Sequence, residues 1–187
     1  MKKFTSACFF LFLSLTLVKA QLLYNNGADV AVTGGGVLFV DGPVENANNG
    51  FLSNAGHTTI RGFFRNGSLA TGGGTNGEYI VHGDWENNNT FTADQSLVRL
   101  RGSAQLITGS QVTTFYDLAL ENGSVKTQTI DANTTHLLSL GTSELATTDF
   151  NMTVTNTSSS AITRLSGFVS STGPGRSDVK REPTNAP

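Results

Sequence analysis

A period of about twenty residues runs through the alternation of apolar and polar positions. In its clearest copy, residues 79–87, an alternating strand leads to a glycine, a polar residue, one apolar residue, a glutamate and an asparagine. The glycines at equivalent positions are Gly42, Gly62, Gly83 and Gly102, at intervals of 20, 21 and 19 residues. Weaker copies follow at 118–122 and 138–141. A repeat of this length, built from strands and turns, predicts a solenoid in which each coil buries its apolar face against its neighbours.

The alternation also predicts which side chains form the core. The positions two and four residues before each glycine are almost all apolar, and they share one face of a strand. They are Leu38, Val40, Thr58, Ile60, Tyr79, Val81, Val98, Leu100, Leu118 and Leu120. Two residues after each glycine, Val44, Phe64, Trp85 and Ala104 are expected inside as well. Each glycine is expected to form a corner, because a residue with a Cβ resists such a bend.

We therefore predict an all-β fold, a single-stranded parallel β-helix of about seven coils. The right-handed crossover rule for parallel strands makes right-handed coiling the expectation.

The outward positions carry charges that alternate in sign from coil to coil. Three residues after the corner stand Glu45, Arg65, Glu86 and then Gln105. One residue before the corner, Asp41 precedes Arg61, and Arg101 precedes Glu121. Stacked coils about 4.8 Å apart would bring these charges into columns. Each exposed pair contributes only about 0.2–1 kcal/mol, so we interpret the columns as devices that fix the register.

The first twenty residues have the pattern of a secretory signal peptide. Lys2 and Lys3 precede an apolar run at 9–18, and cleavage after Ala20 would leave Gln21 as the mature N-terminus. The expected organisation is a signal peptide at 1–20, a β-helix at 21–172 and a polar, disordered tail or truncated continuation at 173–187.

Composition narrows the classes of partner. Only 14% of residues are charged, and removing Lys2, Lys3 and Lys19 with the leader takes the net charge from −2 to −5. Without a basic cluster, a nucleic-acid partner is not expected. The mature chain has no apolar run of transmembrane length. His57, His82 and His136 fall on distant coils, and no nucleotide-binding motif is present, so we predict no metal site and no cofactor.

The stretch 115–123, Phe-Tyr-Asp-Leu-Ala-Leu-Glu-Asn-Gly, follows a leader and Gly-, Asn- and Thr-rich coils. It resembles a phrase that recurs in exported β-solenoid, adhesin-like surface proteins of Bacteroidetes. Many of these use the type IX route and end in a sorting or gliding-motility-associated domain, and no such domain is recognisable in residues 1–187. The resemblance implies a secreted or cell-surface location and an N-terminal fragment of a longer protein with further domains.

The expected function is a structural or adhesive module without catalysis, with a surface polysaccharide or a host-cell glycan as partner. The alternative is a carbohydrate-active or carbohydrate-binding β-helix. Parallel β-helices include polysaccharide lyases and hydrolases, whose chemistry needs convergent carboxylates or a basic residue. Asp84, Glu86 and Arg101 are the candidates for such a site, and Asp41, Glu45 and Arg99 are further ones. Trp85 and Phe63 are candidate sugar platforms, although Trp85 aligns with the core.

Overall fold

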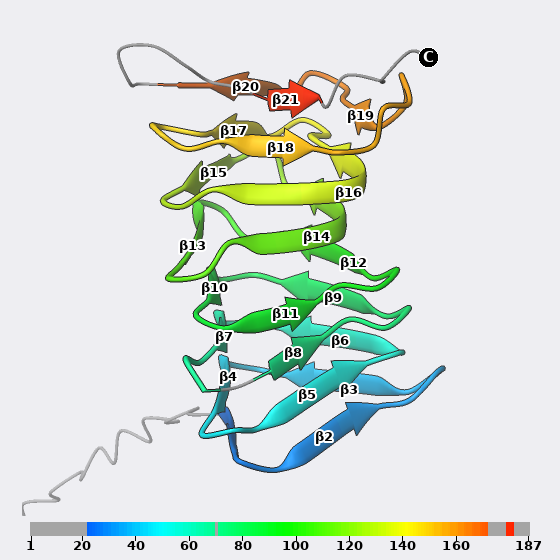
Figure 1. The fold of residues 1–187 in the computed structure, drawn as a ribbon, viewed down its shortest axis with the longest axis vertical. Coiled ribbons are helices and arrows are strands. Elements are labelled where there is room, and N and C mark those ends of the chain that lie inside the picture. The colour runs from blue at the N-terminus through cyan, green and yellow to red at the C-terminus, as the bar shows by residue number, and fades with distance from the viewer. Residues whose placement is uncertain (1–21, 70, 172–178, 182–187) are drawn as a thin grey trace, which may run out of the picture.

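The computed structural model describes residues 22–69, 71–171 and the backbone of 179–181. The predicted signal peptide at 1–20 lies outside the described residues, as does most of the range 173–187. Strands stack as successive coils along one axis (Figure 1). The described residues form a parallel β-solenoid of about seven turns of about 20 residues, without a helix, which confirms the predicted fold class.

Three parallel sheets make the walls of the solenoid. The first sheet contains β1 (Leu23–Asn26), β4 (Val44–Ala47), β7 (Phe64–Asn66), β10 (Trp85–Asn87), β13 (Gln105–Gly109), β15 (Val125–Gln128), β17 (Glu144–Ala146) and β20 (Phe168–Ser170). The second contains β2 (Asp29–Val32), β5 (Phe51–Asn54), β8 (Thr71–Gly73) and β11 (Thr90–Thr92). The third contains β3 (Val37–Val40), β6 (His57–Ile60), β9 (Glu78–Val81), β12 (Leu97–Leu100), β14 (Thr113–Leu120), β16 (Ala132–Ser139), β18 (Met152–Val154) and β21 (Val179–Arg181). A short strand, β19 (Ile162–Thr163), also pairs with β16.

The shape of the coil changes after the fourth turn. The first four coils have three strands each, and the second sheet ends at β11. In the next two coils an eight-residue strand, β14 or β16, follows the strand of the first sheet directly (Figure 1). Their pairing is interrupted by a register shift between Phe115 and Asp117. At the C-terminal end, β21 pairs with β18, so these three residues of the expected tail continue the stack.

The core contains nearly all the inward positions that the alternation predicts, together with residues such as Phe91, Ile107 and Phe115. Among the strand positions before the corners, only Leu38 in the first coil is not fully covered. Trp85 is completely buried, with its ring stacked on Phe64 at a centroid distance of 4.5 Å. Phe91 and Phe115 contact the same indole, at 4.9 and 5.4 Å. Trp85 therefore anchors the core at the change of coil shape, and it is no surface platform for a sugar.

The fourth corner departs from the predicted register. Trp85 pairs with Ile107, not with Ala104, because the turn after Gly102 is three residues longer than the turns after Gly62 and Gly83. Ala104 is therefore exposed, and Glu86 lies beside Thr108 instead of Gln105. The expectations that Ala104 lies in the core and that Gln105 continues the outward column are wrong.

Close stacking, and not an unusual backbone conformation, requires glycine at the corners formed by Gly62 and Gly83. Gly62 and Gly83 have φ angles outside the left-handed region. A Cβ on Gly83 would lie 2.5 Å from the backbone carbon of Gly62, and one on Gly62 would lie 2.5 Å from the nitrogen of Pro43. The Gly83 N–H also donates to the Gly62 carbonyl at 2.9 Å. The expected reason, a bend that Cβ-bearing residues resist, is thus replaced by contact between coils.

A buried ladder of asparagines joins the first four coils. Asn25, Asn46, Asn66 and Asn87 lie on the inner side of the first sheet and are almost fully buried. Each Nδ2 donates to the Oδ1 of the next asparagine, at 2.8, 3.1 and 3.0 Å in turn. The ladder ends at Gly109, which pairs with Asn87. Both the donor and the acceptor of the inner amides of Asn46 and Asn66 are used, whereas Nδ2 of Asn87, the last member of the ladder, is buried without a hydrogen-bond partner in the structure.

Replacing Asn66 by alanine is expected to lower the free energy of unfolding by about 2 kcal/mol. The substitution removes the donor to Asn87 Oδ1 and to the Thr90 carbonyl, which lie 3.0 and 2.7 Å from Asn66 Nδ2. Urea unfolding measures the change, with Asn26→Ala, at an exposed position of β1, as the matched control. The control should cost less than about 0.5 kcal/mol. An equal loss of unfolding free energy in the two variants would show that the buried hydrogen bonds of the ladder stabilise the fold no more than an exposed asparagine does.

Candidate functional site

A column of three charged residues crosses the outer face of the first sheet. Arg65 on β7 lies between Glu45 on β4 and Glu86 on β10, as the alternating charges predict. Its Nε donates to Glu86 Oε2 at 2.7 Å, and its Nη1 lies 3.6 Å from Glu45 Oε2. The hydrogen bond with Glu86 raises the pKa of Arg65 against the opposing effect of burial. The guanidinium also covers the ring of Phe63 at 4.9 Å, so this half-buried ring is not a free platform.

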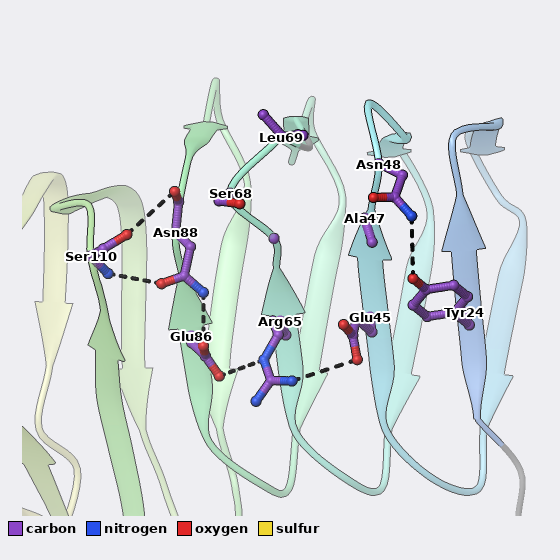
Figure 2. A pocket seen from close by; sticks show the side chains of 11 residues that line it. Tyr24, Glu45, Ala47, Asn48, Arg65, Ser68, Leu69, Glu86, Asn88 and Ser110 are labelled. Carbon is purple, nitrogen blue, oxygen red and sulfur yellow. Dashed lines mark hydrogen bonds and ion pairs between the residues drawn. The ribbon is translucent and has the colours of Figure 1, made fainter.

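Beside this column lies an open groove of about 460 Å³ (Figure 2). It runs across β1, β4, β7 and β10 and reaches the turn after β13. Its lining residues are Tyr24, Glu45, Ala47, Asn48, Arg65, Gly67, Ser68, Leu69, Glu86, Asn88 and Ser110. The groove exists because two small residues lie next to the charged column. Ala47 is the last residue of β4, and Gly67, which follows β7, packs against Ala47.

Hydrogen bonds hold the polar side chains of the groove in place. Asn88 Nδ2 donates to Glu86 Oε1 at 2.7 Å, and Asn88 Oδ1 accepts from the Ser110 N–H at 2.9 Å. At the other end, Asn48 Nδ2 lies 3.4 Å from the Tyr24 hydroxyl. Figure 2 shows these groups along one side of the stacked strands. The groove is therefore a preorganised polar surface that spans several coils.

The residues predicted for a catalytic site do not make contact with one another. Glu86 belongs to the groove and is engaged by Arg65 and Asn88. Asp84 Oδ1 accepts from the Leu106 N–H at 2.7 Å, which ties adjacent coils together. Arg101 pairs with Glu121 at 2.7 Å, at the corner after the third sheet. Each candidate side chain thus has a structural partner in a neighbouring coil.

A second charged network covers the third sheet. Glu78 binds His57 and Arg99, and Glu121 binds both Arg99 and Arg101. Burial raises the pKa of each of these two carboxyl groups, but the hydrogen bonds from their partners outweigh it and leave both pKa values below the usual range. Of these residues, the sequence pattern placed only Arg101 and Glu121 in a shared column. In the structure the network extends over four consecutive coils, from His57 to Glu121.

The predicted pair of Asp41 and Arg61 is not formed. Among the described residues Asp41 makes no ion pair with Arg61, whose guanidinium lies 5.8 Å from the centroid of the Phe39 ring. Burial, followed by the nearby charges of Arg61, Arg101 and Lys126, lowers the pKa of His82. The cationic side chains at this corner thus disfavour a charged histidine.

Lys126 is a buried cationic residue that the sequence pattern did not single out. It lies on β15 beside Gln105, inside the widened fourth corner, and its side chain is fully covered. Its Nζ lies 2.6 and 3.0 Å from the carbonyls of Gly102 and Ser103, 2.8 Å from Gln105 Oε1 and 2.9 Å from Ser124 Oγ. Burial lowers the pKa of Lys126 to about 8. Only the long turn after Gly102 makes room for this polar cluster.

Comparisons with known proteins do not extend this description. No protein-family model, no curated protein and no solved structure matches the chain. Within the described ranges, His, Cys, Asp and Glu form no group of three suited to a metal ion. Likewise, the part of the chain that the structure describes contains no helix long and apolar enough to cross a membrane.

Substituting Arg65 by glutamate is expected to lower the free energy of unfolding by about 1 kcal/mol at low salt, because it puts three carboxylates in one column. The loss should shrink at about 1 M NaCl, where the screening length falls to roughly 3 Å. Thermal or urea unfolding at both salt concentrations measures it. Arg164→Glu, at an exposed position outside the column, is the charge-matched control. An unchanged or raised stability of Arg65→Glu would contradict the electrostatic role of the column.

Lys126 should make stability rise with pH between about 8 and 10.5. In this window the folded chain has lost the lysine proton while the unfolded chain retains it, so the unfolded state binds more protons and rising pH favours folding. The expected gain is roughly 2 kcal/mol. Urea unfolding across the window compares the wild type with Lys126→Met, whose stability should lack this rise. If the free energy of unfolding depended on pH in the same way for both proteins, burial would not shift the pKa of Lys126.

Proposed function

We propose that this protein is an exported β-solenoid that acts at the cell surface, or in the medium, as a structural and adhesive module without catalysis. The observation that carries the proposal is the use of the outward charges. Glu45, Arg65 and Glu86 hold successive coils together, and so do Glu78 and Arg99. Groups committed to such columns are poorly suited to proton transfer, which needs a carboxyl group within reach of a bound substrate.

The fold supports a mechanism of display. Seven coils at the strand spacing make a stiff body of roughly 30 Å, in which equivalent side chains recur at each step. A partner with its own repeat can then make the same contact several times, and weak contacts in series give strong attachment. The leader pattern at 1–20 and the resemblance to exported surface proteins support a location outside the cell.

Incubation of the mature chain, residues 21–187, with plant, algal and bacterial polysaccharides tests this proposal. New reducing ends and the absorbance of unsaturated sugars report cleavage, while co-sedimentation with insoluble polymers reports binding. We expect retention on at least one polymer and no products. Products would overturn the proposal in favour of an enzyme. The absence of both products and retention would contradict an adhesive role toward glycans.

A further inference from the structure

We propose that the groove across β1, β4, β7 and β10 binds a neutral, hydroxyl-rich oligosaccharide chain that lies along the solenoid axis. This inference rests on the proposed adhesive function and assigns it to one face of the molecule. The sequence pattern indicated the outward column of Glu45, Arg65 and Glu86 on this face. It did not indicate the groove beside the column, because Tyr24, Asn48 and Asn88 belong to no repeat of the corner phrase.

The shape of the groove fits an extended chain better than a compact ligand. It is open to solvent along one side, and its floor is crossed by consecutive strands (Figure 2). From Tyr24 in the first coil to Ser110 in the fifth, four steps of the stack span roughly 19 Å. A chain of several sugar rings would therefore cross the strands at right angles and meet the same edge of each coil.

The polar groups of the groove match vicinal hydroxyl groups. Glu45 has unused acceptor capacity, because its described ion pair with Arg65 is long at 3.6 Å. Asn88 has both its amide oxygen and nitrogen engaged, which fixes the plane of the amide. Ser68 is exposed at the rim between these side chains. Planar carboxylate and amide groups held in fixed positions can exchange hydrogen bonds with a pair of neighbouring hydroxyls without paying further ordering entropy.

Two exposed apolar groups complete the surface. Tyr24 is 46% exposed, and Figure 2 shows its ring at one end of the groove, beside Asn48. Leu69 is 61% exposed on the rim, in the turn after β7. An aromatic ring with a polar tip is suited to a ligand whose ring faces are apolar and whose edge carries hydroxyls. Tyr24 thus provides the stacking surface for a sugar ring for which Trp85 and Phe63 were the candidates in the sequence.

The charges of the groove favour a neutral ligand. Two carboxylates, on Glu45 and Glu86, flank the single guanidinium of Arg65, which they already neutralise. A polyuronate, a sulfated glycan or a nucleic acid would meet net negative charge without a free cation in the lining. A neutral chain avoids this repulsion, and its hydroxyls can donate to the carboxylates.

The test measures the binding of the mature chain to soluble neutral polysaccharides and to matched polyuronates by affinity electrophoresis. Tyr24→Ala and Asn88→Ala should each weaken binding to a neutral polymer about tenfold, whereas Tyr24→Phe, which keeps the ring, should stay within about twofold of wild type. Tyr116→Ala is the matched control, because it removes another tyrosine ring, one that stacks on His136 on the third sheet. Unfolding curves verify that each variant is folded.

Each outcome bears on one of the two proposals. Weakened binding in both groove variants with an unchanged Tyr116→Ala supports the groove. Wild-type binding that none of the groove variants alters overturns the groove and leaves the adhesive function standing. Binding of polyuronates alone, or of no soluble glycan, also overturns the groove assignment. Cleavage of the polymer would instead overturn the proposed non-catalytic function.

Discussion

The register between coils is the constraint on which the rest of the structure depends. Every strand pairs in parallel with its equivalent one turn away, and a slip of one residue would exchange the inner and outer faces. The asparagine ladder enforces the register from inside, since Asn46 can reach Asn66 only when their strands are aligned. The Arg65 column enforces it from outside. Inner and outer columns oppose the same slip.

The same register creates a surface that no single coil possesses. A groove forms where Ala47 and Gly67 follow one another in the stack, next to a column of long charged side chains. Its amides and carboxylates are held by partners in adjacent coils, as with Asn88 and Ser110. Structural stability and the proposed binding surface therefore arise from one set of contacts.

The interior changes character at the fourth corner. Before it, asparagines and aromatic rings stack in order. After it, Gly109 ends the ladder, and Gln105 and Lys126 form a polar cluster where the turn is longer. The buried ammonium is surrounded by neutral acceptors that replace water, which limits the cost of its burial. The three-strand coil gives way to the long strands β14 and β16 at the same level.

The sequence by itself determined the solenoid, the length of its coils and most of its core, because a strand alternates faces and a repeat must present like residues to its neighbours. It also indicated the column of Glu45, Arg65 and Glu86. It could not fix the register past Gly102, since the alternation within each strand does not reveal the length of the turn between strands. Three extra residues in that turn place Ile107 where Ala104 was expected. The groove was decided only by the tertiary structure. Its residues come from different coils and from turns, and whether Tyr24 and Asn88 face one hollow depends on how the coils stack.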